Sequence, residues 1–333
     1  MEQVFLSELI TSGAWADRPL AGSLASEGQA MLLALAEDLS RLDGVRVATT
    51  WDNRLGPFPL EDVEAEVVES VAESREAFAD KCRLSDRTLV IAPELEGQLA
   101  QQFQRVIDCG GHWVGSSLGA LQLASDKLAT FEHLRSRGIP AVPTWTSQKS
   151  SPPKGSDRVI WKRRDGAGSV GLEILDAGAD PTDQTWIGQP LVRGLPVSVA
   201  VLASPAHDLQ TSLPVAVQHI SPDDRLRYLG GEIPSRIEAT GIEAISELAV
   251  CAVAAVEGLA GWIGVDLVVP DRAPGAPLVI EINPRLTTSY LGYRQLSRVN
   301  LSRWVAWPEQ RPGPLEWHDG RVIFTAEGDW QRE

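Results

Sequence analysis

Two stretches in the C-terminal third, Gly261-Trp-Ile-Gly-Val-Asp-Leu-Val-Val-Pro270 and Pro277-Leu-Val-Ile-Glu-Ile-Asn-Pro-Arg285, decide how the chain folds. Both are rich in β-branched and apolar residues, which is typical of strands. The residues between them, 271–276, are turn formers. The pattern therefore predicts a β-hairpin, in which we take Pro270 to pair with Pro277.

This hairpin brings acidic side chains together. In that register Asp266 lies opposite Glu281, and Asn283 shares the face of Glu281, although a slip of one residue would turn Asp266 away. Like charges opposite each other destabilise a strand pair, so a hard cation is expected to compensate. Two carboxylates and an amide carbonyl suit Mg²⁺, or Mn²⁺ in its place, with waters and phosphates completing the shell. The alternative for Asp266 is a buried, hydrogen-bonded acid.

Composition bounds the class of protein. The chain has 333 residues, 43% hydrophobic and 23% charged, and this length permits two or three domains. A net charge of −15 argues against nucleic acid or an anionic membrane as a partner. Cys82, Cys109 and Cys251 have no metal or disulfide spacing, which predicts free, buried thiols in a reducing compartment. Without a basic leader or an apolar run of about 20 residues, we expect a cytoplasmic protein.

The N-terminal third alternates between strand and helix patterns. Strands are predicted at 4–10, 45–50, 87–92 and 112–115, helices at 26–42 and 94–108, and a strand followed by a helix within 61–81. This alternation is typical of a parallel α/β sheet. Ligands bind such sheets at the carboxyl ends of the strands, near Glu8 and Glu94. These two acids are either ligand contacts or solvated loop residues.

The remaining elements form a small β-rich module and a larger C-terminal part. The patterns predict a helix at 124–138, strands at 158–163, 172–175, 185–192 and 197–203, a helix at 237–258, and a final helix at about 289–304.

A glycine-rich loop, Gly166-x-Gly168-x-x-Gly171, lies inside the small module. It matches the dinucleotide fingerprint, but that fingerprint needs a following helix, and residues 172–175 alternate like a strand. We therefore expect a glycine-rich hairpin, a flap whose N–H groups close on phosphates. Lys162 precedes the flap, whereas the lysine of a protein kinase follows it, and no His-Arg-Asp or Asp-Phe-Gly motif is present. The alternative is that residues 166–171 form a purely structural hairpin that binds no ligand.

Together these features resemble the ATP-grasp superfamily over about residues 87–300. The resemblance implies that Lys127 and Lys162 bind ATP, that Asp266, Glu281 and Asn283 bind the metal, and that Arg285 follows in the Glu-Ile-Asn-Pro-Arg version of the motif. It also implies a flap with Gly166, Gly168 and Ser169 on the phosphates, and a hinge with Gln189, Pro190, Leu191 and Val192 on the adenine.

The resemblance implies an α/β (α+β grasp) fold. Residues 1–120 would form an N-terminal parallel α/β pre-ATP-grasp domain, 121–193 the small ATP-grasp lobe with the flap, and 194–333 the C-terminal lobe with the metal site. Two positions depart from the pattern. Pro196 stands where many members have a ribose-binding Glu, and Gly264 stands where D-alanine-type ligases have an Arg. We interpret Gly264 as leaving open space for a different substrate.

Within the superfamily, the chain is most similar to the tyramine–L-glutamate ligases of methanofuran-type cofactor biosynthesis. The similar stretches are Ser26–Met31, Val90–Glu94, Ser125–Lys127, Gly138–Pro140, Tyr228–Gly231 and Glu281–Tyr290. The resemblance implies that ATP, tyramine and L-glutamate give γ-glutamyltyramine, ADP and phosphate through an acyl phosphate. Lys162 and Arg285 would be catalytic, because they neutralise the transferring oxygens.

Substrate contacts are expected from location. Tyramine arrives as an ammonium ion, which needs an acid, and the candidates are Glu8, Glu27 and Glu94; Thr287, Thr288 and Ser289 could hydrogen-bond the glutamate. The partners would be small molecules, with a homodimer as the common default. Three alternatives stay open: another amino-acid or dipeptide ligase of the superfamily, a non-catalytic nucleotide-binding regulator, and, disfavoured by the strand after the flap, a Rossmann-type oxidoreductase. Taken singly, Lys127 and Lys162 could also be surface cations.

Overall fold

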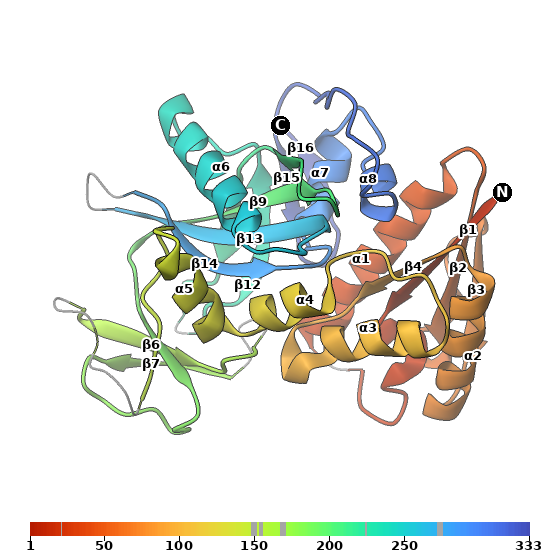
Figure 1. Ribbon diagram of the computed structural model, residues 1–333, viewed down its shortest axis with the longest axis horizontal. Helices are drawn as coiled ribbons and strands as arrows, with labels where there is room; N and C mark the ends of the chain where they lie inside the picture. The colour runs from red at the N-terminus through yellow and green to blue at the C-terminus, as the bar shows by residue number, and fades with distance from the viewer. Residues whose placement is uncertain (21, 148–151, 153–155, 167–170, 224, 272–275) are drawn as a thin grey trace.

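The computed structural model spans residues 1–333 and describes all of them except 21, 148–151, 153–155, 167–170, 224 and 272–275. The described strands form three sheets. Figure 1 shows an N-terminal sheet covered by helices, a small sheet that carries β6 and β7, and a larger sheet between them that carries the hairpin β13–β14.

The N-terminal sheet is parallel, with strand order β3-β2-β1-β4. Its elements are β1 (Glu2–Glu8), α1 (Ser23–Ser40), β2 (Val45–Asp52), β3 (Val63–Val68), α2 (Val71–Leu84), β4 (Arg87–Ile91) and α3 (Gln98–Asp108). Alternate side chains of β1 enter separate cores: Leu6 clusters with Leu35 of α1, and Phe5 with Phe78 of α2. The predicted parallel α/β sheet is confirmed.

Two boundaries of the N-terminal part were predicted wrongly. The strand predicted at 112–115 is only an isolated bridge between Trp113 and Thr88. The first strand ends at Glu8, and a short π-helix, Ile10–Ala14, follows it. The carboxylate of Glu8 accepts hydrogen bonds from the backbone N–H groups of Ile10 and Thr11, which turns the chain out of the strand.

The small sheet is antiparallel, with strand order β5-β8-β6-β7. Its strands are β5 (Trp145–Thr146), β6 (Arg158–Lys162), β7 (Leu172–Asp176) and β8 (Ile187–Pro190), and α4 (Leu118–Ser125) and α5 (Lys127–Ser136) precede them. Lys162 pairs with Leu172 across β6 and β7. The glycine loop therefore joins two antiparallel strands, as predicted, although Gly168 and Ser169 lie outside the described residues.

The large sheet has the order β14-β13-β9-β11-β12-β15-β16, with β10 on β9. Its strands are β9 (Gly194–Ala203), β10 (Gln210–Ser212), β11 (Ala216–Ile220), β12 (Tyr228–Ile233), β13 (Gly261–Pro270), β14 (Leu278–Asn283), β15 (Val322–Thr325) and β16 (Trp330–Arg332). Val265 and Leu267 face the core against α6 (Ala239–Ala254). Since side chains alternate, Asp266 points from the other face, into the cavity described below.

The hairpin register is confirmed at the acids and wrong nearer the turn. Asp266 pairs with Glu281, but Leu267 pairs with Val279, so Ile280 is the extra residue of a β-bulge. The bulge allows Val279 and Ile282 both to reach the α6 core. The assumed pairing of Pro270 with Pro277 is therefore one residue out of register.

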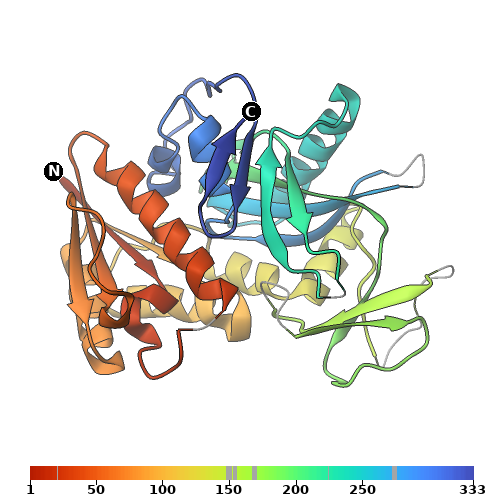
Figure 2. The same cartoon turned by 180° about the vertical axis from the view of Figure 1, so that it is seen from behind.

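The predicted final helix is two helices, α7 (Tyr290–Leu296) and α8 (Ser302–Ala306). The break occurs where side chains satisfy the backbone: the hydroxyl of Ser297 accepts from the N–H of Val299, and Asn300 accepts from the N–H of Ser302. Figure 2 shows β15 and β16 beside β12, three strands that the sequence analysis did not assign.

Other expectations are met in part. Cys82 is buried, but Cys109 is half-buried and Cys251 is exposed, because Cys251 lies on the outer side of α6. No helix among the described residues is long and apolar enough to cross a membrane.

Candidate active site

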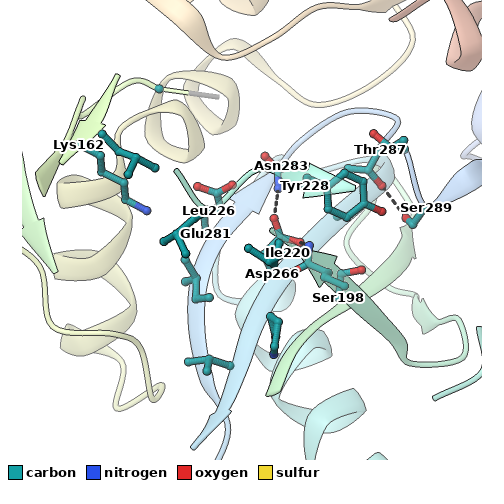
Figure 3. Close-up of a pocket in the computed structure, with 18 of the residues that line it drawn as sticks. Lys162, Ser198, Ile220, Leu226, Tyr228, Asp266, Glu281, Asn283, Thr287 and Ser289 are labelled. Atoms are coloured by element: carbon teal, nitrogen blue, oxygen red, sulfur yellow. Dashed lines mark hydrogen bonds between the residues drawn. The ribbon is translucent and has the colours of Figure 1, made fainter. Parts of the chain in front are cut away.

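A cavity of about 830 Å³ lies where the three sheets meet. The N-terminal part contributes Glu8 and Glu27, the small sheet Lys162, and the large sheet Asp266 and Arg285. Figure 3 shows Lys162 on one side of this space, facing Glu281, with Asp266 and Asn283 beyond. We call this space the central cavity.

The acid pair lies on the large-sheet wall of the central cavity. Both oxygens of Asp266 accept amide hydrogen bonds: Oδ2 from Nδ2 of Asn283 at 3.1 Å and Oδ1 from Nε2 of Gln218 at 2.9 Å. Burial, together with the charge of Glu281, raises the pKa of Asp266 to about 7. Burial also opposes ionisation of Glu281, but Lys127 and Lys162 outweigh it and lower the pKa of that carboxyl.

Two lysines reach the acid pair from separate elements. Lys127, at the start of α5, is buried; its Nζ lies 3.1 Å from Oε2 of Glu281 and donates to the carbonyl of Gly166. Lys162 ends β6, and burial, reinforced by Lys127, lowers its pKa to about 8. The interpretation of Lys127 as a surface cation is therefore wrong, and the root of the glycine flap lies at the acid pair.

The donor set fits a hard divalent cation. Among the described residues, no group of three or more His, Cys, Asp or Glu side chains could hold a metal. The predicted set has only two acids, Asp266 and Glu281, and adds the amide oxygen of Asn283; all three are oxygen donors on one hairpin. Such a set suits Mg²⁺, which commonly keeps waters and takes phosphate oxygens to complete its shell.

Arg285 and Glu94 form a bidentate ion pair. Nε of Arg285 donates to Oε1 of Glu94 at 2.9 Å, and Nη2 donates to Oε2 at 2.8 Å. The Glu94 side chain is only 4% exposed. Glu8 and Glu27, by contrast, form no salt bridge within the part of the chain that the structure describes. Of the three predicted substrate acids, Glu94 is paired with an arginine, whereas Glu8 and Glu27 have no salt-bridge partner among the described residues.

Glu8 is held in place on one oxygen. Its Oε2 accepts from the N–H of Ile10 and from both the N–H and the hydroxyl of Thr11, and burial raises its pKa to about 7. α1 approaches so closely that a Cβ on Gly28 would lie 2.6 Å from the carboxyl carbon of Glu8. Burial also raises the pKa of neighbouring Glu27. Both acids line the central cavity.

The segment after the hairpin carries predicted hydroxyl groups. The hydroxyl of Thr287 accepts from Nε1 of Trp262 at 3.0 Å and lies 2.9 Å from that of Ser289, whereas Thr288 also lines the cavity. A Cβ on Gly264 would collide with the methyl group of Thr287. The interpretation of Gly264 as open space is therefore wrong, because Thr287 already fills it.

The predicted adenine hinge borders the same cavity. Gln189, Pro190, Leu191 and Val192 all line it. The side chain of Gln189 is buried and donates to the hydroxyl of Thr144 at 2.9 Å. The N–H of Leu191 already donates to the carbonyl of Arg158 at 3.0 Å, so this group is engaged within the protein.

Two cavity residues were missed as site residues. Gln218 on β11 contacts Asp266, and Tyr228 on β12 lies beside Thr287 and Ser289 in Figure 3. Burial raises the pKa of Tyr228 well above its ordinary value, so its hydroxyl stays protonated. The only signal was Tyr228-Leu-Gly-Gly231 as a stretch of family resemblance, and no pattern pointed to Gln218.

Family models match most of the chain. The model of the ATP-grasp domain matches residues 124–289, and that of the pre ATP-grasp 3 domain matches residues 45–121. The chain belongs to the ATP-grasp superfamily. The sheets described above accordingly divide into a pre-ATP-grasp part and an ATP-grasp part.

Individual relatives agree with this. The chain is 28% identical to the tyramine–L-glutamate ligases of Methanocaldococcus fervens and Methanocaldococcus jannaschii, over 63% of its own length. It spans only 62% and 58% of these relatives. Among solved structures, an ATP-grasp superfamily protein from Archaeoglobus fulgidus superposes with a TM-score of 0.74 at 26% identity, covering 98% of this chain and 92% of that one.

A structure with lower sequence identity is similar to this chain in its fold. The N5-carboxyaminoimidazole ribonucleotide synthetase of Thermotoga maritima superposes with a TM-score of 0.66 at 19% identity, covering 97% of this chain and 80% of that one.

Proposed function

We propose that this protein is an ATP-dependent carboxylate–amine ligase that joins the γ-carboxylate of L-glutamate to the amine of tyramine, releasing ADP and phosphate. The single observation that carries the reaction class is the facing pair Asp266–Glu281, with Lys127, Lys162 and Arg285 around it in one cavity. The names of the Methanocaldococcus relatives support the choice of substrates.

Asp266, Glu281 and Asn283 would hold Mg²⁺, which when bound neutralises charge on the phosphates of ATP. Lys127 and Lys162 would hold the terminal phosphates from the side of the small lobe. Because Lys162 is half-buried, its contact with a phosphate oxygen would be weakened less by solvent than at an exposed site. The hinge residues would hold the adenine at the far end of the cavity.

The first chemical step activates the acid. An oxygen of the glutamate γ-carboxylate forms a bond to the γ-phosphorus, and the bond from that phosphorus to the ADP oxygen breaks. Arg285 stabilises the charge on the transferring oxygens, as phosphoryl transfer requires of a protein. Thr287, Thr288 and Ser289, beside this position, would hydrogen-bond the amino-acid part of the substrate.

The second step forms the amide. The neutral amine attacks the acyl carbon, the bond from that carbon to the phosphate oxygen breaks, and the amine loses a proton. Glu8 and Glu27, which form no salt bridge in the described structure, would bind the incoming ammonium, and one of them would take the proton whose loss makes the amine neutral. The departing phosphate can take the second proton, which the nitrogen loses as the amide forms. Leu24 and Met31 lie on the same face of α1 as Glu27, at i−3 and i+4, and would contact the aromatic ring of tyramine.

ADP release in the presence of Mg²⁺ and a panel of acids and amines tests this function. Release that needs both L-glutamate and tyramine, with γ-glutamyltyramine detected by mass, supports the proposal. Release with another pair would make the protein a different ligase of the superfamily. ATP binding without ADP release from any pair would contradict the proposal and indicate a nucleotide-binding regulator.

A further inference from the structure

The ion pair between Arg285 and Glu94 joins two parts of the chain that are 191 residues apart. Arg285 follows β14 of the large sheet, and Glu94 follows β4, at the carboxyl end of the N-terminal parallel sheet. Both side chains are largely buried, at 14% and 4% exposure. A buried guanidinium is costly without a partner, so the N-terminal part supplies the charge that lets Arg285 line the cavity.

The donors of Arg285 are divided between protein and cavity. A guanidinium group has five N–H donors in a planar fork. Nε and Nη2 each give one to Glu94, and Nη1 gives one to the carbonyl of Leu286 at 3.1 Å. These contacts fix the plane of the group from two directions. They leave one N–H on Nη1 and one on Nη2 for an anion, and a bidentate contact with phosphate needs two such donors.

Glu94 is itself held in place by its loop. The short turn Leu95–Gly97 follows it, and the N–H of Glu96 donates to Oδ2 of Asp165 at 3.1 Å. Asp165 belongs to the segment that leads into the glycine flap. Both oxygens of Glu94 accept from Arg285, so the negative charge of Glu94 is already matched by a cation of the protein in this arrangement.

We infer that Glu94 is a positioning residue: it fixes the guanidinium plane of Arg285 so that its remaining N–H groups meet the transferring phosphoryl group. The inference rests on the proposed function for its catalytic consequence, whereas the fixing of the guanidinium can be measured without any substrate.

The direct readout is the Nε–Hε signal of Arg285 in ¹⁵N-correlated NMR spectra, assigned by its loss in Arg285→Lys. In the unaltered protein we expect slow exchange of this hydrogen with water. In Glu94→Gln, which keeps the shape and loses one acceptor and the charge, exchange should quicken at least about tenfold. Unchanged exchange would overturn the inference.

Glu309→Gln is the matched control. Glu309 pairs with Arg87 at 2.7 Å and 3.3 Å, and this pair also joins the N-terminal sheet to the C-terminal part, away from the central cavity. Glu309→Gln therefore removes a carboxylate from another contact between the same two parts, at a more exposed position than Glu94. Exchange at Arg285 should stay slow in this variant, and equal quickening in both variants would assign the effect to loosening of the contact between the two parts and overturn the inference.

Kinetics supply the second readout. With Mg²⁺, ATP, L-glutamate and tyramine, Glu94→Gln should lower kcat about 10- to 100-fold with little change in the KM for ATP, L-glutamate or tyramine, because misplacing one group by about 1 Å costs that much. In an Arg285→Ala background the same change should have no further effect. A raised KM for tyramine at unchanged kcat would make Glu94 a substrate contact instead. If the unaltered protein releases no ADP with any pair, the proposed function fails, and the exchange measurement still decides the positioning of Arg285.

Discussion

The ammonium group of Lys127 lies 3.1 Å from Oε2 of Glu281, so a residue expected to hold phosphate contacts a residue expected to hold metal. The two roles therefore share one ion pair. Because Lys127 also donates to the carbonyl of Gly166, the same side chain links the flap root of the small sheet to the hairpin of the large sheet.

Replacing Lys127 by Met should weaken the binding of Mg²⁺–ATP at least about tenfold, because the half-buried carboxylate of Glu281 loses one of its two nearby lysines and the phosphates lose a donor. Isothermal titration calorimetry measures this directly. Lys81→Met is the matched control, since Lys81 is also buried and pairs with Glu64 at 2.5 Å, on the N-terminal part. Equal affinity in Lys127→Met and the unaltered protein would remove Lys127 from the nucleotide site.

Gln218→Leu tests the support of the acid pair. It removes the amide group that donates to Oδ1 of Asp266, so the carboxylate of Asp266 is held less firmly. We therefore expect the variant to bind Mg²⁺–ATP about 10-fold more weakly. Gln210→Leu is the control, because Gln210 also donates from a half-buried strand position, but to the carbonyl of His207. If calorimetric titration gives the two variants the same affinity for Mg²⁺–ATP, Asp266 needs no support from Gln218 on β11.

Local patterns were enough to predict the parallel N-terminal sheet, the antiparallel strands around the glycine loop and the facing pair Asp266–Glu281. These features depend on strands that are adjacent in sequence or on simple alternation of side chains. The bulge at Ile280 was not predictable, because it reflects how Val279 and Ile282 pack on α6.

Long-range contacts limited the prediction of the site. Gln218 reaches Asp266 across the intervening strand β9. Its own strand, β11, was not predicted, and it can be recognised only from its pairing with β9 and β12 in the folded sheet. Glu94 was expected to contact substrate from its place at a strand end, which gives location but no partner. Only the folded chain brings Arg285 to Glu94. The structure therefore shows Glu94 in an ion pair, where the sequence analysis expected an acid free to bind substrate.

Gly28→Ala tests the close approach of α1 to Glu8. The added Cβ would lie 2.6 Å from the carboxyl carbon of Glu8, so we expect a loss of about 1–3 kcal/mol in the free energy of unfolding, measured with urea. Gly119→Ala in α4 meets no heavy atom within 4 Å and should instead stabilise the protein by up to about 1 kcal/mol. If both variants gain stability, α1 does not approach Glu8 as described.

The pH dependence of stability should carry the signature of Glu8. Burial raises its pKa from 4.5 to about 7, so the folded state holds the proton more tightly than the unfolded chain. The stabilisation is complete below about pH 4.5, is lost as the pH rises towards 7, and stays lost above it. The shift corresponds to about 3 kcal/mol.

Glu8→Gln, which cannot ionise, removes that dependence. Urea unfolding at a series of pH values should find the variant similar to the unaltered protein near pH 4 and more stable by about 1–3 kcal/mol near pH 8. A difference that does not change with pH would mean that Glu8 titrates normally in the fold.

Transfer of ¹⁸O tests most directly the claim that the central cavity activates a carboxylate. L-glutamate labelled with ¹⁸O in its γ-carboxylate is incubated with the protein, Mg²⁺, ATP and tyramine, and the released phosphate is examined by mass. We expect one ¹⁸O atom in the phosphate for each amide formed, and neither product with Asp266→Asn or Glu281→Gln, both still folded. Amide formation accompanied only by unlabelled phosphate would contradict the account.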